Sequence, residues 1–191
     1  MTRNERYLAS LMVELFQTER SAIMHCDREA DRLGKTPPAH TLEDVADHAR
    51  MALARLTRLA DEGKIPAPKP IQKIGQAIGR TFSRARMHVF DHLIDSEKSY
   101  RGTLLGMRHG VDLVHLVHPL AVAAECYELA AWCTEWLEKR QPLLERAVGQ
   151  LSWFANHPEI AFEKAGHRRI STSDQAAVVS PPSSVSTSPV T

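Results

Sequence analysis

Apolar residues recur at every third or fourth position along most of this chain, and that spacing restricts its fold more than any other feature. Between Glu5 and Leu33 the spacing runs without a proline, and Glu19 fills one gap in the apolar stripe. An α-helix has about 3.6 residues per turn, so residues spaced in this way share one face. The sequence has no sustained alternation and no Asn-Gly or Asp-Gly turn between apolar runs. It therefore predicts an all-α protein.

Glycine and proline divide this pattern into helices. Gly34 predicts the end of a helix over residues 5–33, because glycine readily adopts the left-handed conformation that stops a helix. A second helix is expected to begin at Thr41, whose hydroxyl can cap the first turn, and to close at Gly63. Three prolines within residues 64–70 then separate this helical pair from the rest of the chain.

A third helix is predicted from Ile71 to Leu104, and Glu97 lies within its apolar stripe. A carboxylate among core positions is unusual, so Glu97 is the residue whose surroundings would tell most about function. Gly106 and Gly110 predict a break after this helix. The apolar members of the stripe are Ile71, Ile74, Ile78, Phe82, Ala85, Val89, Leu93, Tyr100 and Leu104.

Two more helical segments are expected before the composition changes. The fourth runs over residues 120–139, directly after Pro119, and is apolar around most of its circumference, which is typical of a buried helix. Pro142 is expected to break or kink it. The fifth segment covers residues 144–154 and is amphipathic.

Long helices joined in pairs, with a proline-bearing crossover between the pairs, are typical of a four-helix bundle. We expect residues 1–165 to form this bundle with an appended C-terminal helix. Residues 166–191 form a tail rich in Ser, Thr and Pro. Such a composition buries too little apolar surface to offset its ordering entropy, so a disordered tail is expected.

The balance of positive and negative charges restricts the classes of partner that the chain could attract. The chain has 24 Lys and Arg against 23 Asp and Glu, which gives no general attraction to nucleic acid. Six basic residues and no acidic one lie between Gly63 and Phe90: Lys64, Lys69, Lys73, Arg80, Arg84 and Arg86. Without interleaved aromatic residues this stretch is better interpreted as a solvated face than as a nucleic-acid site.

Cellular location is predicted from the cysteines and the apolar runs. Cys26, Cys126 and Cys133 each lie in an apolar helical pattern, so reduced core thiols are expected. The longest apolar run, residues 120–137, contains three glutamates, which argues against a membrane span. The charged first ten residues lack the pattern of a secretory signal. A cytoplasmic protein without membrane contact is expected.

Three residues on three different predicted helices suggest a protein family: Glu19, His48 and Glu97. With them the chain resembles the ferritin-like helical bundles, in which core glutamates and Glu-x-x-His motifs hold a pair of metal ions. This resemblance implies a di-metal carboxylate protein with oxidase or metal-storage activity and iron or manganese as cofactor. Glu125 and Glu128 are the fourth predicted helix's candidates for the same site.

The sequence contains no Glu-x-x-His motif, however. The alternative is that Glu19 and Glu97 pair with arginines or with Tyr100. We favour this alternative, and with it a non-enzymatic protein without a cofactor. Such a protein acts through protein–protein contacts or self-association, and the expected surface lies on the fourth or fifth helical segment.

His109, Asp112, His115 and His118 recur at intervals of three. Each step of three turns back by about 60° on a helix, so one straight helix cannot aim all four at one ion. Asp112 with His115, or His115 with His118, could share an ion. A hydrogen-bonded loop cluster or a solvated corner is the favoured interpretation.

Overall fold

Helices form the whole architecture of the described residues, which are 3–66 and 95–163 of this computed structural model. No β-strand occurs in these two ranges, which confirms the all-α prediction. The long helices are α1 (Arg3–Leu33), α2 (Pro37–Asp61), α4 (Ser96–Ala123) and α5 (Tyr127–Gly149), and the short helices are α6 (Leu151–Asn156) and α7 (Pro158–Ala161).

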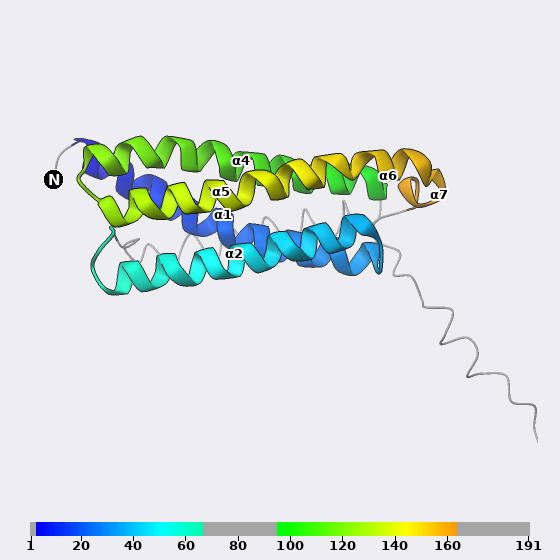
Figure 1. Cartoon of the computed structure of the whole chain (residues 1–191), viewed down its shortest axis with the longest axis horizontal. Helices are drawn as coiled ribbons and strands as arrows, with labels where there is room; N and C mark the ends of the chain where they lie inside the picture. Colours follow the sequence, from blue (N-terminus) through cyan, green and yellow to red (C-terminus); the bar gives the residue numbers. More distant parts are fainter. Residues whose placement is uncertain (1–2, 67–94, 164–191) are drawn as a thin grey trace, which may run out of the picture.

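The four long helices lie side by side along one axis (Figure 1). Helix α1 packs against α2 and α4, and α5 packs against the same two helices. Both α2 and α4 run opposite to α1 and α5, so each packed pair is antiparallel. Each long helix contributes fully buried apolar side chains to one core, for example Leu15, Leu42, Val114 and Leu129.

The turn between α1 and α2 lies at Gly34, where the sequence predicts that the first helix ends. Gly34 has a φ of 64°, and its N–H bonds the carbonyl of Ala30 at 2.9 Å. The predicted start of the second helix at Thr41 was wrong, because α2 begins at Pro37. Thr36 caps this helix by accepting from the N–H of Ala39 at 3.4 Å. Proline fits the first turn, where its missing N–H has no helical partner to lose.

Helix α4 is continuous from Ser96 to Ala123, so the predicted break at Gly106 and Gly110 was wrong. A Cβ on Gly110 would lie 3.3 Å from Thr18 Cγ2 of α1 and 3.6 Å from Trp136 of α5. The absence of a side chain at this position therefore lets α4 approach both neighbours. Tertiary packing offsets the low helix propensity of glycine here.

In the turn between α4 and α5, the left-handed position is occupied by Glu125, a residue type that rarely adopts this conformation. Glu125 has a φ of 55°. Its N–H bonds the carbonyl of Val122 at 3.0 Å, while the N–H of Cys126 bonds that of Ala121 at 2.9 Å. These two bonds form a Schellman motif, which usually has glycine in the left-handed position. The fourth helix therefore starts at Tyr127, not at residue 120 as predicted.

Pro119 and Pro142 lie inside α4 and α5, so neither ends its helix. Each proline lacks the N–H that would bond the carbonyl oxygen four residues earlier, which is that of His115 for Pro119 and that of Glu138 for Pro142. All four residues are exposed. Water can bind those oxygens. The segment predicted at 144–154 is divided, because α5 continues to Gly149 and α6 begins at Leu151.

Several predictions lie outside the described residues. These are the third helix before Asp95, five of the six basic residues of its segment, and the tail at 166–191. Within the described part of the chain, none of the helices has the length and apolar character needed to cross a membrane.

Candidate functional site

Three charged or polar side chains meet in the interior where α1, α2 and α5 face one another. Arg140 of α5 donates from Nη2 to Glu19 Oε2 of α1 at 2.8 Å and from Nε to His48 Nδ1 of α2 at 3.0 Å. The exposed fraction of the side chain is 2% for Arg140 and 0% for Glu19. The guanidinium also lies over the ring of Trp136, 4.7 Å from its centroid. One cation therefore joins three helices.

The sequence pattern explains each of these positions. Glu19 occupies the gap in the apolar stripe of α1, so it points inward, and His48 lies beside the stripe of α2. Arg140 was missed by the sequence analysis. It follows Trp132 and Trp136 at steps of four, and that spacing on a helix places it on their buried face.

Burial shifts the pKa values of this cluster. Burial raises the pKa of Glu19, and the Arg140 guanidinium acts in the opposite direction. Burial, followed by the charges of Arg140 and Lys139, lowers the pKa of His48 to about 4. A neutral His48 suits the geometry, because its Nδ1 must carry a lone pair to accept from Arg140.

The other candidate ligands do not join this cluster. Glu97 is half-buried in the first turn of α4, and its Oε1 pairs with Arg101 Nε at 2.5 Å. Glu125 lies in the turn before α5, and Glu128 is exposed in the first turn of that helix. The expected core position of Glu97 was therefore wrong. Of the two kinds of partner expected for Glu19 and Glu97, arginines or Tyr100, the structure has an arginine in both cases.

Of the five predicted ligands, only Glu19 and His48 meet, and they meet at Arg140. Among the described residues no three His, Cys, Asp or Glu side chains converge as a metal site requires. A divalent ion between Glu19 and His48 would have to replace the guanidinium, which already carries the positive charge there.

The histidine series lies on continuous helix, not at a corner as predicted. Two of its members face α5: His118 Nε2 lies 3.3 Å from Thr134 Oγ1, and His115 Nε2 lies 3.2 Å from Gln141 Nε2. His109 pairs with Glu14 of α1 at 3.1 Å. The histidines therefore join α4 to both neighbours at the surface and do not converge on one ion.

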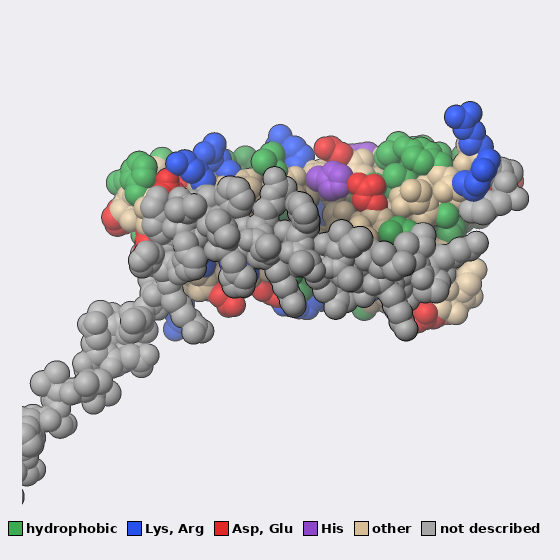
Figure 2. Space-filling view, turned by 180° about the vertical axis from the view of Figure 1, so that it is seen from behind, with side chains coloured by type: hydrophobic (Ala, Val, Ile, Leu, Met, Phe, Trp, Pro, Cys, Tyr) green, Lys and Arg blue, Asp and Glu red, His purple; other side chains and the backbone are tan. Residues whose placement is uncertain are grey.

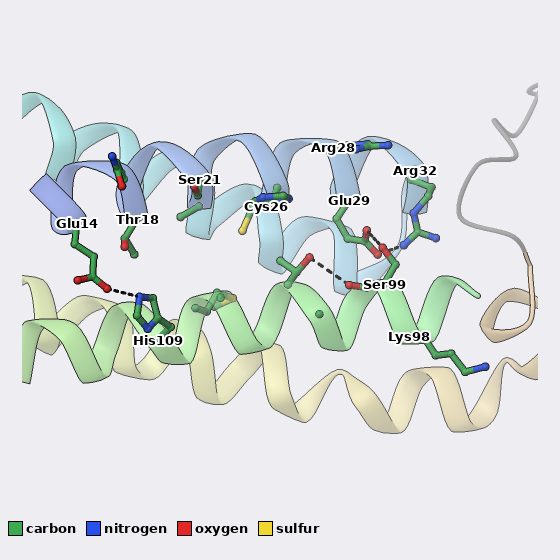
Figure 3. A pocket seen from close by; sticks show the side chains of 17 residues that line it. Glu14, Thr18, Ser21, Cys26, Arg28, Glu29, Arg32, Lys98, Ser99 and His109 are labelled. Atoms are coloured by element: carbon green, nitrogen blue, oxygen red, sulfur yellow. Dashed lines mark hydrogen bonds and ion pairs between the residues drawn. The ribbon is translucent and has the colours of Figure 1, made fainter. Parts of the chain in front are cut away.

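A groove of about 690 Å³ runs between α1 and α4 (Figure 3). Residues with small side chains or none line its middle: Ser21, Ala22, Gly102 and Gly106. At one end lies the pair of Glu14 and His109. At the other end Ser99 Oγ donates to Glu29 Oε2 at 2.8 Å, and Arg32 pairs with Glu29. Burial lowers the pKa of Arg32 to about 10.

A different surface is formed by the last turns of α4 and the start of α5. No Asp, Glu, Lys or Arg occurs between Leu113 and Ala124. Leu116, Val122 and Tyr127 are exposed by 42%, 47% and 64%, and the neighbouring Pro119 and Ala123 are also exposed. Hydrophobic side chains gather toward this end of the molecule, near the N-terminus, on the face shown in Figure 2. We call these five residues the α4 end patch.

The chain matches no protein-family model, no curated protein and no solved structure. The buried cluster, the groove and the α4 end patch are the features of the described residues that bear on function.

Proposed function

We propose that this protein is a non-enzymatic helical protein that acts through protein contacts and self-associates through the α4 end patch. The patch is the observation that supports this proposal. Apolar side chains exposed singly are ordinary, but several large ones gathered together are typical of interaction surfaces. Copies of one chain most often associate as two-fold dimers, in which the same patch serves both subunits.

The fold that we propose is a ferritin-like four-helix bundle with an appended C-terminal segment. Its support is the antiparallel packing of α1 and α5 against α2 and α4. The Arg140 guanidinium, where a bundle of that class would hold a metal ion, supports a protein without a cofactor. We further propose a cytoplasmic location, since Cys26, Cys126 and Cys133 are free thiols.

Sedimentation velocity over a range of micromolar concentrations tests the self-association. The wild-type chain should sediment as a dimer or larger species, and Leu116→Glu and Val122→Glu should shift it to monomer, because each places a charge in an apolar interface. Met51→Glu is the matched control, since Met51 is an exposed apolar residue on α2, away from the patch, with 64% of its surface accessible. A wild-type chain that is monomeric throughout would disprove the proposal.

The second candidate is a di-metal carboxylate protein with iron or manganese and oxidase or metal-storage activity. One observation favours it, namely that Glu19 and His48 approach the same interior point from different helices. The separation of Glu97 from this point and the presence of Arg140 weigh against it. We therefore rank it second.

A further inference from the structure

The outward face of α4 carries a series of exposed side chains in the middle of the helix. Helix α4 lies along one edge of the bundle, in contact with α1 and α5 (Figure 1). Four residues share its outward face, because they follow one another at steps of three, four and four. All four are exposed. We call them the α4 outer ridge: Leu105, Arg108, Asp112 and Leu116.

The α4 outer ridge has the same pattern of residue types about its centre. The point halfway between Leu105 and Leu116 lies between residues 110 and 111, and the point halfway between Arg108 and Asp112 lies at residue 110. A two-fold axis at this level would lay the α4 helices of two copies antiparallel. Each leucine would then face the other leucine of the second copy, with an offset of about 1.5 Å, the rise of one residue.

The two charges of the ridge fit the antiparallel arrangement. Among residues 3–66 and 95–163, neither Arg108 nor Asp112 forms an ion pair or hydrogen bond through its side chain. With the axis at residue 110, each guanidinium faces a carboxylate of the second copy, and the symmetry forms this pair twice. A parallel two-fold arrangement would place Arg108 against Arg108 of the second copy, and such like charges repel. The charges therefore favour one direction.

The two leucines supply apolar contacts on both sides of these ion pairs. Leu105 is exposed by 71% and Leu116 by 42%, so both have apolar surface to bury. Leu116 also belongs to the α4 end patch, and the ridge extends that patch toward the middle of the helix. A contact between two single helices buries less surface than a standard interface. We therefore expect a dimer with a micromolar dissociation constant.

We propose that two copies of this chain associate with their α4 helices antiparallel and the two-fold axis at residue 110. Arg108 pairs with Asp112 of the second copy, and Leu105 packs on Leu116 of the second copy. This inference rests on the proposed self-association and names its surface. The α4 end patch of each copy lies along the first half of α4 of the other.

Two charge reversals in the full chain test the ion pairs. Arg108→Asp and Asp112→Arg should each raise the dimer dissociation constant by about ten-fold or more in sedimentation velocity, because like charges then face each other twice. An equimolar mixture of the two variants should recover the wild-type constant, since each chain meets the opposite charge on the other. Arg20→Asp is the matched control, because Arg20 is exposed on α1, and its constant should match the wild type.

Leu105 separates this arrangement from a contact of one end patch on another. Leu105→Glu should raise the dissociation constant by about as much as Leu116→Glu, since the two leucines face each other and a charge there lies in an apolar contact. A contact restricted to the two end patches would leave Leu105 in solvent. Leu105→Glu would then have no more effect than Arg20→Asp, which would overturn the arrangement.

Two further results would overturn the arrangement while leaving the self-association in place. One is a wild-type dimer that Leu116→Glu disrupts and that both charge reversals leave unchanged. The other is a dimer that both reversals weaken and their mixture does not restore, because the charges would then act within one chain. A wild-type chain that is monomeric throughout would disprove the self-association itself, and the arrangement with it.

Discussion

Arg140 and Glu19 form an ion pair inside the core, with Nη2 2.8 Å from Oε2 and almost no exposed surface on either side chain. Taking two charges out of water costs free energy that their attraction repays only with good geometry and further hydrogen bonds. The bond to His48 and the ring of Trp136 supply such contacts. The pair therefore requires α1, α2 and α5 to meet in one register.

Removing the cation should leave a buried carboxylate without compensation. Arg140→Met is expected to lower the free energy of unfolding by about 3–5 kcal/mol, measured by urea denaturation. The double variant Arg140→Met/Glu19→Leu should recover much of that loss, because no buried charge is left.

Arg146→Met is the control on the same helix, because Arg146 pairs with Asp44 at the surface. Its cost should stay within about 1 kcal/mol. Equal costs for the two arginine variants would show that Arg140 is not the buried partner of Glu19.

Acid should weaken the contribution of His48. Its pKa of about 4 in the folded protein lies below the ordinary value of 6.5, so the folded state takes up the proton less readily than the unfolded state. The contribution is complete above pH 6.5 and is lost as the pH falls toward 4, by at most about 3 kcal/mol.

The raised pKa of Glu19 acts in the opposite sense, so the effect of His48 must be isolated by substitution. Urea denaturation of the wild type and His48→Gln between pH 4 and 7 measures it. The glutamine variant keeps an acceptor for Arg140 and should lose less stability on acidification. Parallel curves would disprove a lowered pKa at His48.

Replacing the proline inside α5 should stabilise the protein. Pro142→Ala restores an N–H that can bond the carbonyl of Glu138, and alanine has the highest helix propensity. We expect a gain of about 1 kcal/mol or more in thermal or urea denaturation. Pro37→Ala should give no gain, because Pro37 occupies the first turn of α2. A loss of stability in Pro142→Ala would mean that the proline ring makes a needed contact.

The close approach of α4 to its neighbours should be sensitive to a side chain at Gly110. Gly110→Leu places a side chain against Thr18 and Trp136, and overpacking of this kind costs about 1–3 kcal/mol. Gly149→Leu should change stability by less than about 1 kcal/mol, since a Cβ there meets no neighbour. Urea midpoints compare the two, and equal midpoints would remove the packing argument.

The helical spacing and most helix ends of the first half could be predicted because their signals are local. Gly34 and Gly63 adopt the left-handed conformation that the sequence indicates. In the second half of the chain, the glycine and proline residues did not predict the helix ends correctly, because the surrounding structure overrides their local preferences. Packing holds Gly110 in a helix, exposed backbone tolerates Pro119 and Pro142, and a glutamate replaces glycine in the α4–α5 turn.

The candidate site was predicted only in part, for a similar reason. The apolar stripes correctly marked Glu19 and His48 as polar residues near the core. Glu97 shares the spacing of such a stripe, yet it lies in the first turn of α4, where it pairs with Arg101. Arg140 finds its partners only where α1, α2 and α5 pack together. A local sequence pattern does not indicate which side chains this packing brings into contact.

Metal analysis of the full chain, purified from cells supplied with iron and manganese, tests most directly whether Arg140 is the resident cation of the interior. We predict less than stoichiometric metal in the wild type and the same content in Glu19→Ala. Arg140→Ala should acquire affinity for a divalent ion, because it leaves Glu19 and His48 facing an empty position. Stoichiometric iron or manganese in the wild type that is lost in Glu19→Ala would contradict the account and establish the di-metal alternative.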